Sequence, residues 1–508
     1  MVVEQFPILV VAVSLISAYT ILVAGWLNRK SSCFISIATI TFQLILALFI
    51  LHHVLTWGTI HYPLGGWAPP WGIEYVVDAL NAYVLVILLF ASLLVAIYSW
   101  RSVQSELPAK KTVSFYVLFQ LLVTGLCGIT VTGDMFNLYV FLEISSLAAY
   151  ALIAAAGGRA LKASYNYVIM GSIGACFYLL GVGFLYAVTG SLNMADLMSL
   201  LPPLYGNRVV QAAFVFFVIG MSIKMALFPL HLWQPDAYTY APSAVSAYIA
   251  ATMSHISVYA LIRVVFSVFT LDFVRAYIGM DLAICWVAAI GIIAGSVLAI
   301  AQNNFKRMLA YSSVSQIGYI VLGMGLAPAT TWGFFGAVAH ILNHTIMKGC
   351  LFLVAGAFIY KAGLRDIREF RGLGKRMPYT SAVFTIAALS MIGIPPTVGF
   401  ATKLFLMVAT LETYNYAFAG VLLLNSLLEL VYFGRLIERI YLLHEEPQPE
   451  SESELNGGTR DEKRIPHSML IPMFIFAALC VIAGLFWLTS LATPLIEPLT
   501  NLCTGVMP

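Results

Sequence analysis

Five charged residues lie inside long apolar stretches of this sequence: Glu143, Lys224, Lys348, Lys403 and Glu429. The stretch 214–229 around Lys224 holds no other charged side chain. An ammonium group at the centre of a bilayer costs at least about 2.5 kcal/mol, so a membrane protein keeps one only with a partner, a water path or a function. Buried groups that gain and lose protons can carry protons, and this is the chemistry that the set predicts.

Three titratable groups share one further segment. His340, His344 and Lys348 follow each other at a spacing of four residues, which places them on one face of a helix over about 12 Å. Histidine titrates near neutrality, and burial favours neutral lysine, so this stripe can pass protons along the membrane. In the alternative reading, each histidine is a hydrogen-bonded core residue. We predict no metal site, because no carboxylate is near in sequence and Lys348 repels a cation.

Glu143 and Lys224 are the first expected pair. Glu143 lies nine residues after Asp134, about 14 Å along a helix and near the middle of the membrane. A lone carboxylate there is protonated, whereas one beside Lys224 stays ionised and stabilises the protonated lysine. The pair is therefore either a fixed link between two helices or a pair whose separation sets the proton affinity of Lys224.

Two more buried groups have open assignments. His255 lies in the apolar stretch 251–263, where it either bridges Lys224 to the stripe that ends at Lys348 or bonds to a core neighbour. Glu429 is either an exit carboxylate for Lys403 or a partner of Arg435.

Composition identifies the elements that must hold these groups. Of the 508 residues, 61% are hydrophobic and 10% are charged, far from the balance of a soluble domain. Apolar runs of about 20 residues along the whole chain predict an all-α polytopic membrane protein. We predict fourteen spans: 6–27, 33–55, 76–100, 113–132, 134–156, 163–189, 209–229, 241–269, 281–302, 307–325, 332–360, 378–410, 415–442 and 467–491.

The distribution of Lys and Arg predicts orientation. Nearly all the Lys and Arg residues outside the spans fall in odd-numbered loops or adjoining helix ends, whereas the even-numbered loops hold only Arg208 and Arg275. Positive loops remain cytoplasmic. We therefore expect a multi-pass protein of the cell (inner) membrane with both termini on the non-cytoplasmic side. The net charge of +3 is too small to suggest a nucleic-acid partner.

Two predicted spans are broken in a similar way. The seventh breaks at Phe228–Pro235, after Lys224, and the twelfth breaks at Gly393–Pro396, before Lys403. They are five spans apart, and an odd number of spans reverses direction in the membrane. This predicts inverted five-helix repeats, spans 4–8 and 9–13, whose broken helices mark an ion site near the midplane. Simple packing kinks are the alternative.

These features divide the chain into five parts. We expect a three-helix segment at 1–112, the first repeat at 113–269, the second repeat at 281–442, a disordered cytoplasmic linker at 443–466 and a C-terminal helix at 467–508.

Several motifs resemble those of proton-translocating antiporter-type subunits, which occur in Mrp sodium/proton antiporters, respiratory complex I and membrane-bound hydrogenases. The matching segments are 134–143 (DMFNLYVFLE), 224–236 (KMALFPLHLWQPD) with 241–247 (APSAVSA), 306–318 (KRMLAYSSVSQIG) and 340–349 (HILNHTIMKG). The resemblance covers about residues 75–440.

The resemblance implies roles for the buried groups. It makes Glu143 and Lys224 a modulating pair, His255 and the stripe from His340 to Lys348 the central relay, and Lys403 the terminal lysine. Many members have lysine where this chain has His255, and no family role is assigned to Glu429. Asp134, Asp236 and Glu429 are expected as accessory residues.

Length and the region around Arg263 look most like the Mrp D subunit, and a complex I-type or hydrogenase-type subunit is the alternative. The expected partners are other membrane subunits, the lipid bilayer, protons and sodium. We expect no cofactor and no redox centre in the chain itself, although the host complex of the alternative is a redox-driven translocase. Two rival classes are a quinone-reactive enzyme, for which no cofactor motif is present, and a structural scaffold, for which the lysines would be dispensable.

Overall fold

A computed structural model describes residues 3–279, 281–443 and 464–489. Twelve helices in this part of the chain are long and apolar enough to cross a membrane. The all-α polytopic architecture expected from composition is thereby confirmed. The predicted linker at 443–466 and the end of the C-terminal segment lie largely outside the described residues, and the domain boundaries remain predictions.

The N-terminal helices are α1 (Phe6–Leu27), α2 (Ser31–Trp57) and α3 (Ala79–Glu106). The predicted first repeat contains α4 (Thr112–Val131), α5 (Met135–Ala154), α6 (Arg159–Thr189), α7 (Met194–Leu200), α8 (Arg208–Lys224), α9 (Gln234–Tyr240), α10 (Ser243–Tyr248) and α11 (Ser254–Ile262), and the short α12 (Thr270–Phe273) follows it. The predicted second repeat contains α13 (Asp281–Ile300), α14 (Phe305–Leu326), α15 (Thr331–Ala362), α16 (Leu373–Arg376), α17 (Pro378–Ile392), α18 (Val398–Glu412) and α19 (Tyr416–Tyr441), and α20 (His467–Trp487) follows.

Shorter elements join these helices. The strands are β1 (Ile60–Pro63) and β2 (Glu74–Val77). Single 3-10 turns cover Val3–Gln5, Leu64–Gly66, Ala109–Lys111, Pro202–Leu204 and Ile367–Phe370, and π-helical turns cover Ile249–Met253, Arg263–Val268 and Val274–Ile278.

Both expected helix breaks are present. The seventh predicted span is α8, which ends at Lys224, and the chain becomes helical again only at α9. The twelfth is split into α17 and α18, where Gly393 adopts a positive φ of 89° that ends α17 without steric cost. Because α8, α17 and α18 have 17, 15 and 15 residues, they are not among the twelve long helices, and a total of fourteen crossings stays a prediction.

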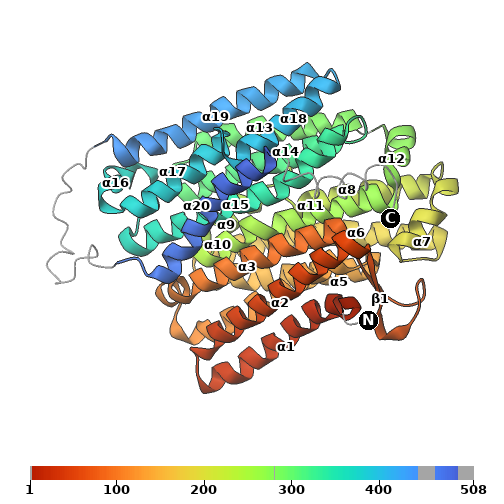
Figure 1. Cartoon of the computed structure of the whole chain (residues 1–508), viewed down its shortest axis with the longest axis horizontal. Coiled ribbons are helices and arrows are strands. Elements are labelled where there is room, and N and C mark those ends of the chain that lie inside the picture. Colours follow the sequence, from red (N-terminus) through yellow and green to blue (C-terminus); the bar gives the residue numbers. More distant parts are fainter. Residues whose placement is uncertain (1–2, 280, 444–463, 490–508) are drawn as a thin grey trace.

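The helices lie side by side with roughly parallel axes (Figure 1). In that view α1 and α2 form the lower edge and α19 forms the upper edge. Helix α15 runs through the interior and packs against α3, α10, α14, α17, α18 and α20. Its residues His340 to Lys348 are therefore enclosed by protein on several sides.

A continuous helical run from Ser243 to Val268 corresponds to the span predicted at 241–269, and its apolar window is wholly buried. Two π-helical turns, Ile249–Met253 and Arg263–Val268, flank the α-helical turns that carry His255. Such turns redirect backbone carbonyls and often occur at functional sites. Here the Ala251 carbonyl accepts a 2.8 Å hydrogen bond from the Thr345 hydroxyl of α15.

The aromatic loop between α2 and α3 folds into a small antiparallel hairpin of β1 and β2. His61 Nδ1 lies 2.7 Å from Glu74 Oε1, and Asn193 donates a 3.1 Å bond to Glu74 Oε2. The Glu74 carbonyl also accepts from the Gly133 amide between α4 and α5. Glu74 beside His61 raises the pKa of the imidazole, and His61 lowers the pKa of the Glu74 carboxyl.

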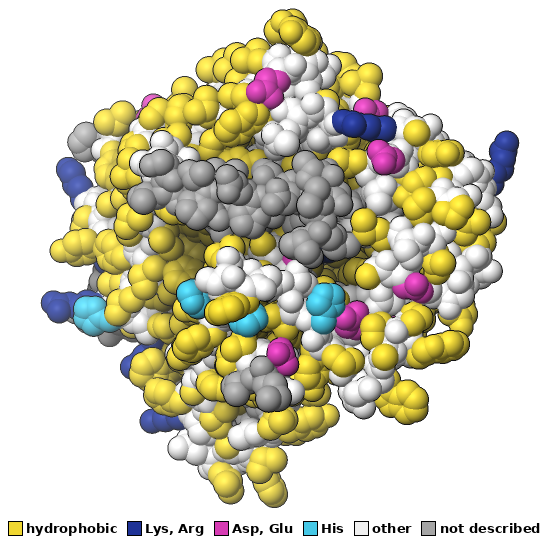
Figure 2. All heavy atoms as spheres, turned by 45° about the vertical axis from the view of Figure 1, so that its right-hand side comes forward, with side chains coloured by type: hydrophobic (Ala, Val, Ile, Leu, Met, Phe, Trp, Pro, Cys, Tyr) yellow, Lys and Arg dark blue, Asp and Glu magenta, His cyan; other side chains and the backbone are white. Residues whose placement is uncertain are grey.

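Large hydrophobic side chains cover much of the surface, as the face in Figure 2 shows. Leu22, Phe49, Leu147, Ile290 and Leu427 are each more than half exposed. Exposed apolar side chains around a bundle whose interior contains lysine, histidine and glutamate reverse the soluble pattern and suit a lipid surround.

Candidate functional site

Glu143 and Lys224 form an ion pair between α5 and α8. Lys224 Nζ lies 3.1 Å from Glu143 Oε1 and donates a 2.8 Å bond to the Ser146 hydroxyl. The lysine side chain is 2% exposed, whereas that of Glu143 is 26% exposed. The pair therefore joins an enclosed cation to a carboxylate that the surroundings of the subunit can reach.

The break after α8 holds Lys224 in place. Trp233 Nε1 donates a 2.9 Å bond to the Ile223 carbonyl at the end of α8, and the Trp233 ring stacks on Tyr167 at 3.7 Å. Gly220 lets α8 approach α6, since a Cβ there would lie only 2.7 Å from the Gly174 carbonyl oxygen.

Three histidines form a central cluster from two helices. His255 Nε2 of α11 lies 2.6 Å from His344 Nδ1 of α15, a distance at which one nitrogen donates a hydrogen bond to the other. The His344 ring stacks on that of His340, with centroids 5.7 Å apart and planes 6° apart. The histidine part of the predicted stripe thus lies on one helix face, and His255 extends it to a second helix.

Lys348 departs from this cluster. It is fully buried, but its Nζ donates to the Leu309 carbonyl at 2.9 Å and to the Ser312 hydroxyl, both on α14. No carboxylate in the described part of the chain lies within ion-pair distance of it. The side chain therefore faces α14, although its Cα continues the stripe.

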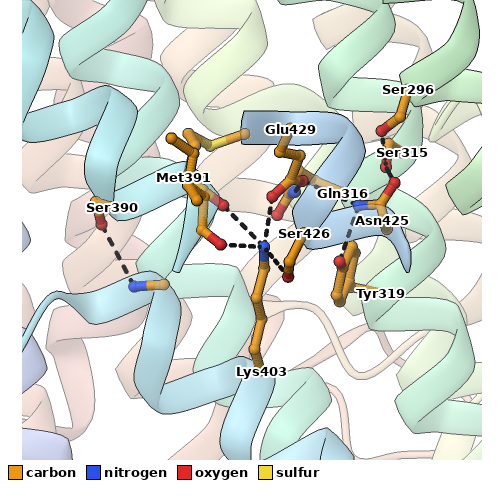
Figure 3. Close-up of polar contacts among 12 residues, drawn as sticks. Ser296, Ser315, Gln316, Tyr319, Ser390, Met391, Lys403, Asn425, Ser426 and Glu429 are labelled. Carbon is orange, nitrogen blue, oxygen red and sulfur yellow. Dashed lines mark hydrogen bonds and ion pairs between the residues drawn. The ribbon is translucent and has the colours of Figure 1, made fainter. Parts of the chain in front are cut away.

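Lys403 and Glu429 form the second lysine–glutamate ion pair (Figure 3). Lys403 Nζ also donates 2.9 Å bonds to the carbonyls of Met391 and Ile392 at the end of α17, and a 3.1 Å bond to the Ser426 hydroxyl. The break between α17 and α18 thus supplies free carbonyls to an ammonium group, as expected of a discontinuous membrane helix. Of the two expected partners of Glu429, Lys403 is the one in contact.

Neutral residues that the sequence did not single out join the histidines to this pair. Gln316 Nε2 donates a 2.6 Å bond to Glu429 Oε1, and Gln316 Oε1 lies 2.9 Å from His340 Nε2. His340 Nδ1 lies 3.0 Å from the Thr402 hydroxyl. Gln316 lies in one of the motif segments, and a polar residue inside an apolar helix was the available signal.

Contacts run from His255 to Lys403 through His344, His340, Gln316 and Glu429. The His344–His340 contact is ring stacking, and the others are hydrogen bonds or an ion pair. Among the described residues, no side-chain hydrogen bond joins Lys224 to His255. The start of α9 lies between them: Trp233, just before α9, bonds to Ile223 beside Lys224, and Gln234 bonds to Ser254 beside His255 at 3.3 Å. Of the expected bridge through His255, the described residues therefore show the contact with His344 and none with Lys224.

Asp134 and Asp236 lie away from this line. Asp134 caps α5, where its carboxylate accepts a 2.6 Å bond from the Asn137 amide. Asp236 pairs with Arg307 at 3.3 Å, with both side chains about one third exposed. Within the described residues, no three His, Cys, Asp or Glu side chains gather so as to hold a metal ion.

A polar cavity of about 420 Å³ opens beside the start of the Ser243–Val268 run. Glu106 accepts bonds from the Ser243 amide and hydroxyl at 2.9 and 3.1 Å, and Lys306 donates a 2.7 Å bond to the Ala241 carbonyl. The cavity therefore adjoins the start of the helical run that carries His255.

Comparison with known proteins identifies the family. Residues 132–429 match the family described as "NADH:quinone oxidoreductase/Mrp antiporter, TM". The chain is 49% identical to the N subunit of an NADH-quinone oxidoreductase from Desulforudis audaxviator (strain MP104C), over 84% of each chain. It is 30% identical to the D subunit of an Na(+)/H(+) antiporter from Bacillus subtilis (strain 168), over 98% of each.

Solved structures agree with this assignment. One chain of the Mrp complex from Dietzia sp. DQ12-45-1b superposes with a TM-score of 0.88 at 26% identity, covering 100% of this chain and 98% of that one. One chain of the archaeal membrane-bound sulfane sulfur reductase superposes with a TM-score of 0.87 at 30% identity, covering 98% and 99%. The chain belongs to the NADH:quinone oxidoreductase/Mrp antiporter transmembrane family, as an antiporter-like membrane subunit.

Proposed function

We propose that this chain moves protons along its buried polar line as a subunit of a multi-subunit membrane complex. The line comprises Glu143, Lys224, His255, His340, His344, Lys348 and Lys403, with Glu429 as the partner of Lys403. The observation that carries the proposal is the series of side-chain contacts from His255 to Lys403 inside an apolar bundle, in which the His344–His340 step is ring stacking and the other steps are hydrogen bonds or an ion pair.

The Glu143–Lys224 pair sets the state of the first lysine. Two unit charges about 4 Å apart interact by about 4 kcal/mol at an effective dielectric of about 20. A pKa unit corresponds to about 1.4 kcal/mol, so parting the pair by a few ångströms makes Lys224 release its proton far more readily. Glu143 is the more accessible partner, and a charge change in an adjacent subunit can draw it away.

The histidines then carry the proton through the interior. A proton shared between His255 and His344 moves over a donor–acceptor distance of 2.6 Å, short enough for direct transfer. The His340 ring stacks on the His344 ring, and no hydrogen bond joins them among the described residues, so transfer from His344 to His340 needs a bridging water or a ring rotation. Lys348, held by hydroxyl and carbonyl groups, is an acceptor beside this route.

For the host complex, we propose the Mrp type with sodium as the exchanged ion. The nearly full-length similarity to the D subunit of an Na(+)/H(+) antiporter and the superposition on the Mrp complex support it. A redox-driven complex is the second candidate, favoured by 49% identity to the N subunit of an NADH-quinone oxidoreductase and by the sulfane sulfur reductase superposition. Purified complex in vesicles separates them: sodium-driven proton movement supports the first, and movement only with an electron donor supports the second.

The test of proton translocation uses the assembled complex in proteoliposomes with an internal pH dye. Lys224→Ala and Lys403→Ala should each abolish driven proton movement while the complex still assembles. Lys162→Ala, which removes an exposed lysine of α6, is the matched control and should transport normally. Full transport by both line variants would reject the relay and leave a structural scaffold.

A further inference from the structure

Gln316 stands between the central histidines and the terminal ion pair. It lies on α14, is fully buried, and offers one end of its amide to His340 and the other to Glu429. Figure 3 shows it beside Glu429, with Asn425 and Tyr319 on the same side of Lys403. No other neutral residue in the described part of the chain hydrogen-bonds both groups.

The charge of Glu429 fixes the direction of this amide. Glu429 pairs with Lys403 and accepts a 3.0 Å bond from Asn425 Nδ2. An ionised carboxylate only accepts hydrogen bonds, so the NH₂ group of Gln316 faces Glu429 and its carbonyl faces His340.

The amide in turn fixes the tautomer of His340. A carbonyl oxygen only accepts, so His340 must carry a proton on Nε2 to satisfy the 2.9 Å contact. In the neutral imidazole Nδ1 is then the acceptor, and the Thr402 hydroxyl 3.0 Å away donates to it. The ionised state of Glu429, on α19, thereby sets the tautomer of His340, on α15.

A primary amide transmits this orientation but no proton. Imidazole, carboxyl and ammonium groups exchange protons in the physiological range, whereas the glutamine side chain has no such titration. We propose that Gln316 is a positioning residue that blocks direct proton transfer from His340 to the Lys403–Glu429 pair while Glu429 is ionised. The proposal rests on the proposed function, since it assigns a gate within the same line.

Protonation of Glu429 removes the constraint. A neutral carboxyl has a donor as well as acceptors, so the amide is then free to rotate and His340 is no longer held in one tautomer. Transfer past this point therefore waits for a change at the terminal pair that lets the amide leave the space between His340 and Glu429, so that the proton passes without Gln316. The titratable groups that face Glu429 or His340 are Lys403, Tyr319, Lys348, His344, His255 and Tyr432.

Two variants of the reconstituted complex test the gate. Gln316→Glu keeps the shape and adds an exchangeable proton, so the passive proton leak through undriven vesicles should rise at least about tenfold. Gln316→Met keeps the length and removes both hydrogen bonds. It should leave the passive leak unchanged, lower driven transport about tenfold and shift its pH profile, because His340 is no longer fixed.

Gln120 supplies the matched control. This buried glutamine of α4 bonds to the hydroxyls of Ser14 and Ser36, and Gln120→Glu and Gln120→Met should change neither the leak nor the pH profile. The gate is overturned if the passive proton leak of Gln316→Glu equals that of wild type and the pH profile of driven transport in Gln316→Met also equals that of wild type. If Gln316→Glu does not assemble, the profile of Gln316→Met decides alone.

The Lys224→Ala variant keeps the two proposals apart. If it abolishes transport while the Gln316 variants behave like the Gln120 variants, the gate is wrong and the relay stands. If Lys224→Ala transports fully, the relay itself is wrong.

Discussion

Lys403 pairs with a carboxylate, Glu429, that has no exposed surface, whereas the carboxylate that pairs with Lys224, Glu143, is 26% exposed. The two lysine–glutamate pairs therefore differ in access although both adjoin broken helices. The Glu143 side chain can be reached from outside the chain, whereas Glu429 contacts only groups of its own chain. Under the proposed function, this asymmetry suits control from outside at the first pair and control from within at the second.

Removing Glu429 alone should destabilise the protein. Glu429→Leu leaves the ammonium of Lys403 buried without its counter-charge, which costs about 3–5 kcal/mol. The thermal midpoint of the purified complex should therefore fall, and driven transport should be lost.

The double variant Lys403→Met with Glu429→Leu removes both charges together. It should restore most of the thermal midpoint but none of the transport, since apolar replacement of a whole buried pair is often neutral. Equal midpoints for the single and double variants would contradict the pairing.

Removing the His255 imidazole should interrupt the central cluster. His255→Gln retains a polar side chain of similar reach but no titratable nitrogen, so driven transport should fall about 100-fold. Proton flux into vesicles measures this. The control is His231→Gln at the helix break, a histidine that packs against Phe228 and Tyr311 outside the line. Equal rates for the two variants would remove His255 from the pathway.

The His61–Glu74 contact should make the hairpin sensitive to pH. The folded pKa of His61 is raised, so its contribution is full below the unfolded value of about 6.5 and disappears as pH rises through the folded value. The folded pKa of Glu74 is lowered, so its contribution is full above about 4.3 and disappears as pH falls through the folded value.

The His61→Gln variant should therefore lose thermal stability relative to wild type near pH 5.5 and little near pH 8.5. The effect is small, below about 1 kcal/mol, because the imidazole is 58% exposed. His52→Gln on the exposed face of α2 is the control. A deficit that is larger at the higher pH would show that the contact has the opposite sign.

Adding a methyl group to Gly220 should disturb the first pair from a distance. The nearest atom to a new Cβ is the Gly174 carbonyl oxygen at 2.7 Å. This is a backbone atom, which cannot move aside as the end of a flexible side chain can. Gly220→Ala should cost about 1–3 kcal/mol and displace Lys224. Thermal midpoint and transport should both fall. Gly183→Ala on α6, where a Cβ meets nothing within 4 Å, should change neither.

Sequence reasoning located the charged groups and the helix breaks because both carry strong local signals. A lysine in an apolar span and a Pro-rich interruption stand out whatever surrounds them. The four-residue spacing of His340 and His344 likewise predicted their common face, and their rings stack there.

Partner choice and side-chain direction were harder to predict. Lys348 continues the spacing of the histidines, yet its long side chain bends to carbonyl and hydroxyl acceptors on α14. The partner of Glu429 depended on how α18 and α19 pack. Gln316 and Thr402 escaped notice because neutral side chains in membrane helices are common, and their importance follows from contacts between distant segments.

The most direct test removes one titratable side chain at each of three places along the buried polar line. Driven proton flux is measured for the assembled complex carrying Lys224→Ala, His344→Phe or Lys403→Ala, with Lys162→Ala as reference. Groups acting in series predict that each cut alone abolishes flux. Wild-type flux in any one of the three assembled variants would contradict a single path through these residues.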